Sequence, residues 1–174
     1  MVETSRPSPW TLVVALLMVA LTGCADGRSS ADLGALEALP ILETHVAGGQ
    51  RLAGPKGLTA SDGFGALPGG GTDATVSWSS PDSALSTAQF YAKELQQQGW
   101  TEIGARCLEP TSTGQYQKLF VVSAHHGTLS SGSVAWVDVE IALDDGAVTA
   151  AVLLSALDPG DVPASPDDTS CIEG

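Results

Sequence analysis

Apolar and polar residues alternate along the second half of the chain with the period of two that is typical of β-strands. Residues 134–143 show this alternation most clearly. Every second residue is aliphatic and lies on one face of the predicted strand: Val137, Val139, Ile141 and Leu143. The opposite face carries Trp136, Asp138 and Glu140. Related patterns predict strands at 74–79, 100–108, 116–125 and 148–156, and Asp145-Gly146 is a hairpin signal before the last of them.

One strong helix is predicted between the strands at 74–79 and 100–108. Ser80-Pro81-Asp82 offers a cap, a proline at the first position and an acid at the positive end of the helix dipole. Apolar residues then recur every three or four positions: Leu85, Ala88, Tyr91 or Ala92, and Leu95. The other face carries Lys93, Gln96 and Gln97. Gly99 supplies the left-handed residue that ends many helices, and we expect Trp100 to pack back on the helix.

Residues 30–71 have weaker signals. Leucines at a spacing of three predict a brief helix between Ser30 and Leu39, ended by Pro40. Residues 41–53 are expected to include a short strand. Residues 54–71 are rich in glycine and proline and show little periodicity, so they are predicted to form a long loop.

Strand, helix and a meander of four strands together predict an α+β fold, with an antiparallel sheet of about four to five strands and one main helix on one face. The segment Tyr91-x3-Leu95-x3-Gly99-Trp100 is similar to one in small secreted or lipid-anchored bacterial domains, where a helix ending in Gly-Trp leads into an antiparallel sheet. We expect a tether and short helix at 24–40, a single domain at 41–157 and an acidic, proline-containing tail at 158–174.

The amino-terminal segment has the features of a targeting signal. Residues 11–21, TLVVALLMVAL, are almost wholly apolar. They are about half of the roughly 20 residues that a transmembrane helix needs, and they fit the apolar region of a secretory signal. Leu21-Thr22-Gly23-Cys24 follows directly and resembles a bacterial lipobox.

The lipobox resemblance implies that residues 1–23 are a signal peptide, that a diacylglycerol is attached to Cys24, and that the new amino terminus is often acylated as well. Two or more chains matter physically, because a single acyl chain binds a membrane only marginally. The alternatives are an ordinary cleaved signal with an incidental cysteine, or a single-pass helix.

The charge of the chain limits its partners. A formal net charge of −13 argues against binding nucleic acid, which needs a basic footprint. It also argues against docking flat on an anionic lipid surface, where polybasic segments provide the attraction. We therefore expect the acyl chains at Cys24 to make the membrane contact.

Cys107 and Cys171 are the two cysteines that remain once Cys24 is lipidated. In an oxidising compartment such a pair predicts a disulfide bond, here closing a loop of roughly 65 residues and stabilising the fold by about 4 kcal/mol on the chain-entropy model. It would pin the acidic tail to the start of the sheet. The alternatives are two reduced thiols, or metal ligation without a nearby histidine.

His125-His126 is the place where two imidazoles occur together. Neighbouring side chains on a strand point to opposite faces, so the two rings cannot bind one metal without a bend. Asp138 and Glu140 share a face of the following strand and can approach one histidine across the ladder. The functional hypothesis is a small hydrolase or metal-dependent site, and the alternative is a solvated strand end.

Trp136 shares its face with Asp138 and Glu140, so we expect it to be exposed and to mark a binding surface, whereas Trp78 and Trp100 are expected in the core. We find no catalytic, metal or cofactor motif. The sequence thus predicts a non-enzymatic, lipid-anchored binding or accessory module outside the cytoplasmic membrane, with an envelope protein or cell-wall component as partner. The alternatives are the histidine enzyme and a structural accessory that needs only its tether.

Overall fold

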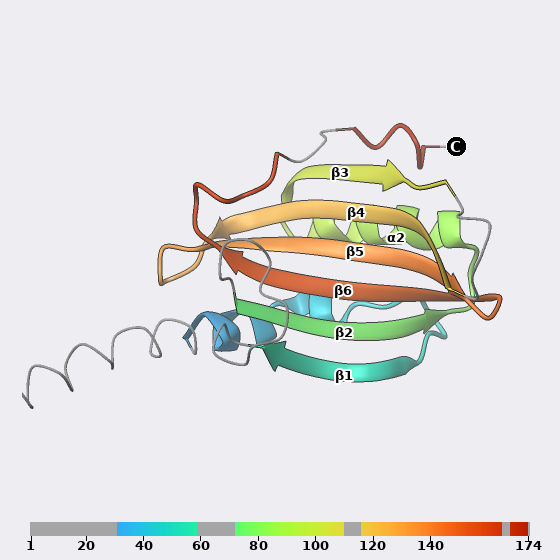
Figure 1. The fold of residues 1–174 in the computed structure, drawn as a ribbon, viewed down its shortest axis with the longest axis horizontal. Helices are drawn as coiled ribbons and strands as arrows, with labels where there is room; N and C mark the ends of the chain where they lie inside the picture. Colours follow the sequence, from blue (N-terminus) through green and yellow to red (C-terminus); the bar gives the residue numbers. More distant parts are fainter. Residues whose placement is uncertain (1–30, 59–71, 110–115, 165–167, 174) are drawn as a thin grey trace, which may run out of the picture.

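The structure is a computed structural model, and it describes residues 31–58, 72–109, 116–164 and 168–173. The predicted signal peptide, Cys24 and residues 59–71 of the predicted loop lie outside these residues. The described chain is α+β, with a six-stranded antiparallel sheet in the order β1-β2-β6-β5-β4-β3 (Figure 1). The strands are β1 (Arg51–Leu58), β2 (Thr72–Ser80), β3 (Thr101–Cys107), β4 (Tyr116–Thr128), β5 (Val134–Asp144) and β6 (Ala147–Leu157).

The meander of β4, β5 and β6 forms the middle of the sheet, as the alternation predicted. Val139 at the centre of β5 pairs with Val122 of β4 and with Val152 of β6. The β5–β6 turn is made by Asp145 and Gly146, both with positive φ (48° and 81°), which is the conformation that favours Asp-Gly in a two-residue hairpin. This turn confirms the hairpin prediction.

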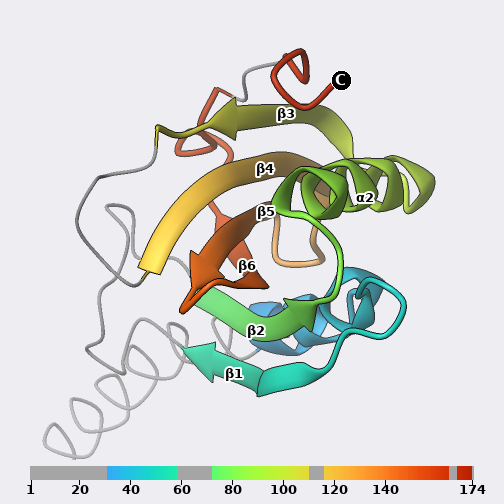
Figure 2. The same cartoon turned by 90° about the vertical axis from the view of Figure 1, so that its right-hand side faces the viewer.

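Helix α2 (Ala84–Gln97) crosses one face of the sheet. It connects β2 to β3, and β3 lies at the far edge of the sheet, so the helix must pass over the strands between them (Figure 2). Ser83 caps the helix by accepting a hydrogen bond from the amide of Ser86 at 3.2 Å. The predicted start at Ser80-Pro81-Asp82 was therefore three residues early, because the Ser80 hydroxyl binds the hydroxyl of Thr87 instead (2.8 Å). Gly99, with φ of +81°, ends the helical turn as predicted.

A second helical region covers the same face beside β1 and β2 (Figure 2). It comprises a helix at residues 31–37 and the 3₁₀ turn η1 (Pro40–Glu43), which buries Ile41 and Leu42. The Tyr91 hydroxyl of α2 donates a hydrogen bond to the carbonyl of Thr44 (3.1 Å) and so joins the two helical regions. No helix in the described ranges is long and apolar enough to cross a membrane.

The core lies between these helices and the facing side of the sheet. It is filled by aliphatic residues of every strand from β2 to β6, by Leu36, Leu95 and Tyr91 from the helical regions, and by two tryptophans. Trp78 and Trp100 are 6% and 4% exposed, which confirms that they belong to the core.

The sheet is larger than the four to five strands predicted, and the edge strand β1 explains part of the difference. It begins at Arg51 and runs into the region predicted as loop. Proline is tolerated there because β1 pairs only with β2, and the pairing shifts register between Ala53 and Lys56, around Pro55. The strand has no clear hydrophobic period, because Gly54, Pro55 and Gly57 interrupt the alternation of side chains.

Candidate binding groove

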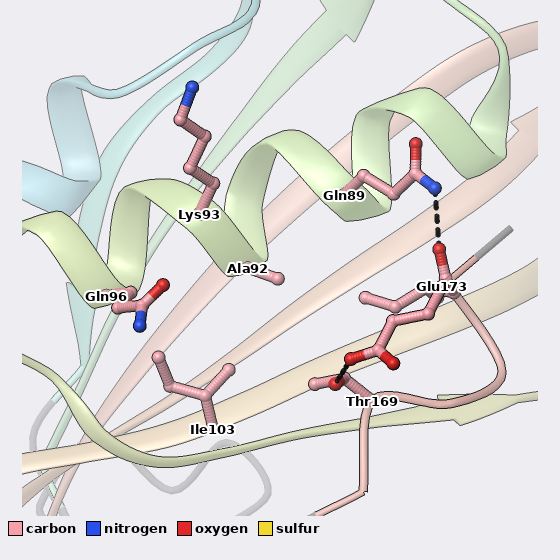
Figure 3. A pocket seen from close by; sticks show the side chains of 8 residues that line it. Gln89, Ala92, Lys93, Gln96, Ile103, Thr169 and Glu173 are labelled. Atoms are coloured by element: carbon pink, nitrogen blue, oxygen red, sulfur yellow. Dashed lines mark hydrogen bonds between the residues drawn. The ribbon is translucent and has the colours of Figure 1, made fainter.

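A groove of about 610 Å³ lies between α2, the edge strand β3 and the carboxyl-terminal residues 168–173, which we call the strap (Figure 3). This volume is within the range of roughly 300–1,000 Å³ typical of small-molecule sites. Three kinds of element line it: α2 with Gln89, Ala92, Lys93 and Gln96, β3 with Ile103, and the strap with Thr169, Ile172 and Glu173. The groove therefore brings together segments from three separate parts of the chain.

The α2 wall follows from helical geometry. Gln89, Ala92, Lys93 and Gln96 are spaced at three, four and seven positions, so they share one side of the helix. The core-facing side is made by Ala88, Tyr91 and Leu95 instead. Ala92 and Gln96 face Ile103 across the groove, whereas Lys93 extends away from it (Figure 3). Lys93 and Gln96, two of the three residues that the sequence placed on the polar side of the helix, thus border the groove.

The β3 wall depends on a bulge near the start of that strand. Thr101 pairs with His125 and Gly104 pairs with Ser123, so three steps along β3 match two along β4. Glu102 within the bulge has a φ of +50°, which is unusual for a residue other than glycine. Bulges re-aim side chains, and here Ile103 points toward α2 (Figure 3) while the Glu102 carboxylate lies 3.2 Å from Nε2 of His125.

The strap is held to β3 by the disulfide bond between Cys107 and Cys171, whose Cα atoms are 6.1 Å apart. The structure thus pairs the two cysteines as the sequence predicted. The amide of Ala105 donates to the carbonyl of Asp168 (2.9 Å), and Nε2 of Gln89 donates to the carbonyl of Ile172 (2.6 Å). The Ile172 side chain is 3% exposed and joins the core.

The strap also has bonds within itself. The Ser170 amide donates to the Asp168 carboxylate (2.8 Å), and hydrogen bonding from Ser170 lowers the pKa of Asp168. The Thr169 hydroxyl donates to the Glu173 carboxylate, and the amides of Ile172 and Glu173 both donate to the carbonyl of Thr169. These contacts give the strap a compact turn, and that turn forms one wall of the groove.

The two histidines lie apart from this groove wall and on opposite faces of β4. His126 packs against Trp100, with ring centroids 5.2 Å apart. His125 contacts Glu102 and lies close to Thr101, whose hydroxyl oxygen is 3.3 Å from Nδ1 and 3.5 Å from Nε2. An oxygen almost equidistant from both ring nitrogens lies along the lone pair of neither, so Thr101 and His125 do not have the geometry of a nucleophile and its base.

Asp138 and Glu140 are each paired with a residue other than a histidine. The Ser123 hydroxyl donates to the Asp138 carboxylate (2.5 Å), and Lys118 forms an ion pair with Glu140. Among the residues that the structure describes, no hydrogen bond or ion pair joins either carboxylate to a histidine. No group of three or more His, Cys, Asp or Glu side chains there is placed to hold a metal ion.

Trp136 differs from the sequence expectation, because it is only 5% exposed. It lies on an interior strand between His125 of β4 and Ser155 of β6, and Ser155 is buried as well. The alternation of residues correctly placed Trp136 on the sheet face away from the core. It does not indicate whether other residues shield that face from solvent. An exposed tryptophan beside Asp138 and Glu140 is therefore not present.

The sequence analysis did not predict the groove, although the sequence contains part of the pattern that forms it. The spacing of Gln89, Ala92, Lys93 and Gln96 defines one side of a helix, yet nothing local indicates that a distant segment lies opposite. Ile172 was not recognised as a core residue, although it is the one aliphatic residue in the strap and directly follows Cys171.

Comparison with known proteins gives one similarity. A family model described as START domain-like matches residues 60–142, which is 83 of the 174 residues and includes β2, α2, β3, β4 and most of β5. Neither the curated proteins nor the solved structures gave a match. The sheet-and-helix architecture agrees with this similarity, so over residues 60–142 the chain is similar to START domain-like proteins.

Proposed function

We propose that the protein is a non-enzymatic, lipid-anchored binding module of the bacterial cell envelope, which holds its ligand in the groove between α2, β3 and the strap. The observation that carries the proposal is the groove itself. It combines an apolar floor from Ala92, Ile103 and Ile172 with polar groups at its rim, which is the usual composition of a ligand site. The START domain-like match over residues 60–142 is compatible with a ligand-binding role.

The lipobox-like Leu21-Thr22-Gly23-Cys24 supports anchoring through Cys24. Residues 25–30 separate this cysteine from Ala31, so the tether reaches about 25 Å at most when fully extended. The helix at 31–37 is fixed to the domain by the buried Leu36 and by a hydrogen bond from Ser133 to Asp32 (3.2 Å). A short tether and a docked helix keep the domain close to the membrane.

The groove lies away from the tethered side in this arrangement. The helical region at 31–43 covers the sheet beside β1 and β2, whereas the groove borders β3 at the opposite edge (Figures 1 and 2). The ligand would then be met on the side of the domain that is turned from the lipid. A groove on this side of the domain suits an envelope protein or a cell-wall component as the partner.

Site-specific photocrosslinking in the protein's own cells tests the binding site. A benzophenone amino acid at Gln96 lies in the groove, and the same residue at Gln97 is the matched control, because it is exposed on the same helix but does not line the groove. We expect a discrete adduct from position 96 and none from position 97. Equal labelling from both positions would contradict the proposal.

A groove-filling substitution sharpens the test. Ala92→Trp places an indole in the space between α2 and Ile103 and is expected to abolish the adduct from position 96. Leu85→Trp is the control, since Leu85 is an exposed residue of α2 outside the groove. An adduct that survives Ala92→Trp would show that the captured molecule lies elsewhere.

A further inference from the structure

We propose that the strap is a redox-controlled wall of the groove: reduction of the Cys107–Cys171 disulfide releases residues 168–173 and opens the site. This inference rests on the proposed function, because it concerns the regulation of the same groove. It follows from how few contacts hold the strap, from where the disulfide lies, and from which lining residues the strap contributes.

Within the residues that the structure describes, the strap has few noncovalent contacts with the rest of the domain. They are the hydrogen bond from Ala105 to Asp168, the hydrogen bond from Gln89 to Ile172, and the burial of the Ile172 side chain. The other hydrogen bonds of the strap are internal, so they give it shape but do not attach it. Fixing the backbone of six residues costs more conformational entropy than two hydrogen bonds and one buried isoleucine side chain return. The disulfide is therefore the contact that keeps the strap in place.

The disulfide is accessible to a reductant. Cys107 and Cys171 are both exposed, and β3 is the edge strand, so the bond lies at the outer margin of the sheet. Two-electron reduction by a dithiol of an extracytoplasmic oxidoreductase proceeds by thiol–disulfide exchange. One thiolate attacks a sulfur of the Cys107–Cys171 bond, which breaks as a mixed disulfide forms and the other cysteine leaves as a thiolate.

The second thiol of the dithiol then loses its proton and attacks the mixed disulfide. The dithiol leaves as a disulfide, and Cys107 and Cys171 end as two thiols after proton uptake. Release of the strap removes Thr169, Ile172 and Glu173, three of the eight residues that line the groove. The remaining walls, α2 and β3, then face solvent, so a ligand held in the oxidised form would be released.

The test compares the purified mature chain in its oxidised form, after reduction and alkylation, and as the Cys107→Ser/Cys171→Ser variant. Hydrogen exchange at the Ala105 amide reports the strap, because that amide donates to Asp168. The Val139 amide, in the middle of the sheet, reports the fold as a whole. We expect the acceleration of exchange at Ala105 in the reduced and serine forms to be at least ten times the acceleration at Val139.

Two results would overturn the inference. Exchange at Ala105 that stays within twofold would show that noncovalent contacts suffice to hold the strap. Equal acceleration at Ala105 and Val139 would show that the disulfide supports the whole fold rather than one wall of the groove.

Binding of the fluorophore anilinonaphthalene sulfonate gives a separate readout of the groove. We expect the oxidised protein to bind it, and binding to weaken at least tenfold on reduction and in Ala92→Trp. Equal binding by the wild type and Ala92→Trp would count against the groove as the binding site. The Ala105 exchange rate would still decide whether the strap opens, so failure of the proposed function and failure of this inference are distinguishable.

Discussion

Tyr91→Phe tests whether the helix that forms the groove wall is fixed to the amino-terminal region through a buried phenol. Tyr91 is 1% exposed, and its hydroxyl donates to the carbonyl of Thr44. Removing one such hydrogen bond is expected to cost about 1 kcal/mol of unfolding free energy near neutral pH. Burial also raises the pKa of the Tyr91 phenol, because the low-dielectric core disfavours the phenolate.

The raised pKa of Tyr91 gives the variant a distinctive pH dependence. In the unfolded chain the phenol ionises at about pH 10, while in the folded protein it stays neutral. Above that pH the unfolded state binds fewer protons than the folded state, so wild-type stability falls by about 1.4 kcal/mol per pH unit. The contribution is complete below the unfolded pKa and is lost as the pH rises beyond it. Phenylalanine carries no such proton, so the variant lacks this slope.

Wild type is therefore predicted to be about 1 kcal/mol more stable than Tyr91→Phe near neutral pH and to become the less stable protein above about pH 11. Urea unfolding followed by circular dichroism at several alkaline pH values measures the difference. A stability difference that stays constant from neutral to alkaline pH would refute the reasoning, because it would mean that Tyr91 ionises equally in both states.

Three further predictions concern the cap, the disulfide and the anchor. Ser83→Ala should cost about 1 kcal/mol in urea unfolding, because it removes the acceptor for the Ser86 amide, and an unchanged stability would show that another residue starts the helix. Cys107→Ser/Cys171→Ser should lower the free energy of unfolding by up to about 4 kcal/mol on the chain-entropy model for the loop closed by Cys107 and Cys171; a thermal midpoint equal to that of the oxidised wild type would contradict this. Cys24→Ser should move the protein from the membrane fraction to the soluble extracytoplasmic fraction, and continued membrane retention would argue for a different attachment.

The middle of the sheet was predictable because its signals are local. Residues 134–143 alternate strictly, and Asp145-Gly146 supplies a turn whose backbone conformation few other pairs adopt easily. Helix α2 was predictable for the same reason, from its apolar spacing and from Gly99. Its start was misplaced because Ser80 and Ser83 are equally good caps by residue type, and the choice depends on Thr87, which binds Ser80.

The features that the sequence did not predict depend on contacts between distant segments. β1 is an edge strand with a proline, so nothing in its own residues separates it from a loop. The burial of Trp136 reflects coverage of a sheet face, which a period of two does not encode.

The groove needs a bulge that turns Ile103 toward α2 and a strap brought in by Cys171. The bulge arises from a mismatch between two strands, so its effect on Glu102 and His125 appears only once β3 and β4 are paired.

The most direct test of the proposed anchoring is the intact mass of the mature protein purified from its own membranes, together with the mass of its amino-terminal peptide. The proposal predicts that the chain begins at Cys24 and carries the mass of a diacylglycerol, with a further acyl chain where the amino terminus is modified. A mature protein that begins at another residue, or that carries no lipid and is recovered from the medium, would contradict a tethered module and remove the reason to orient the groove away from the membrane.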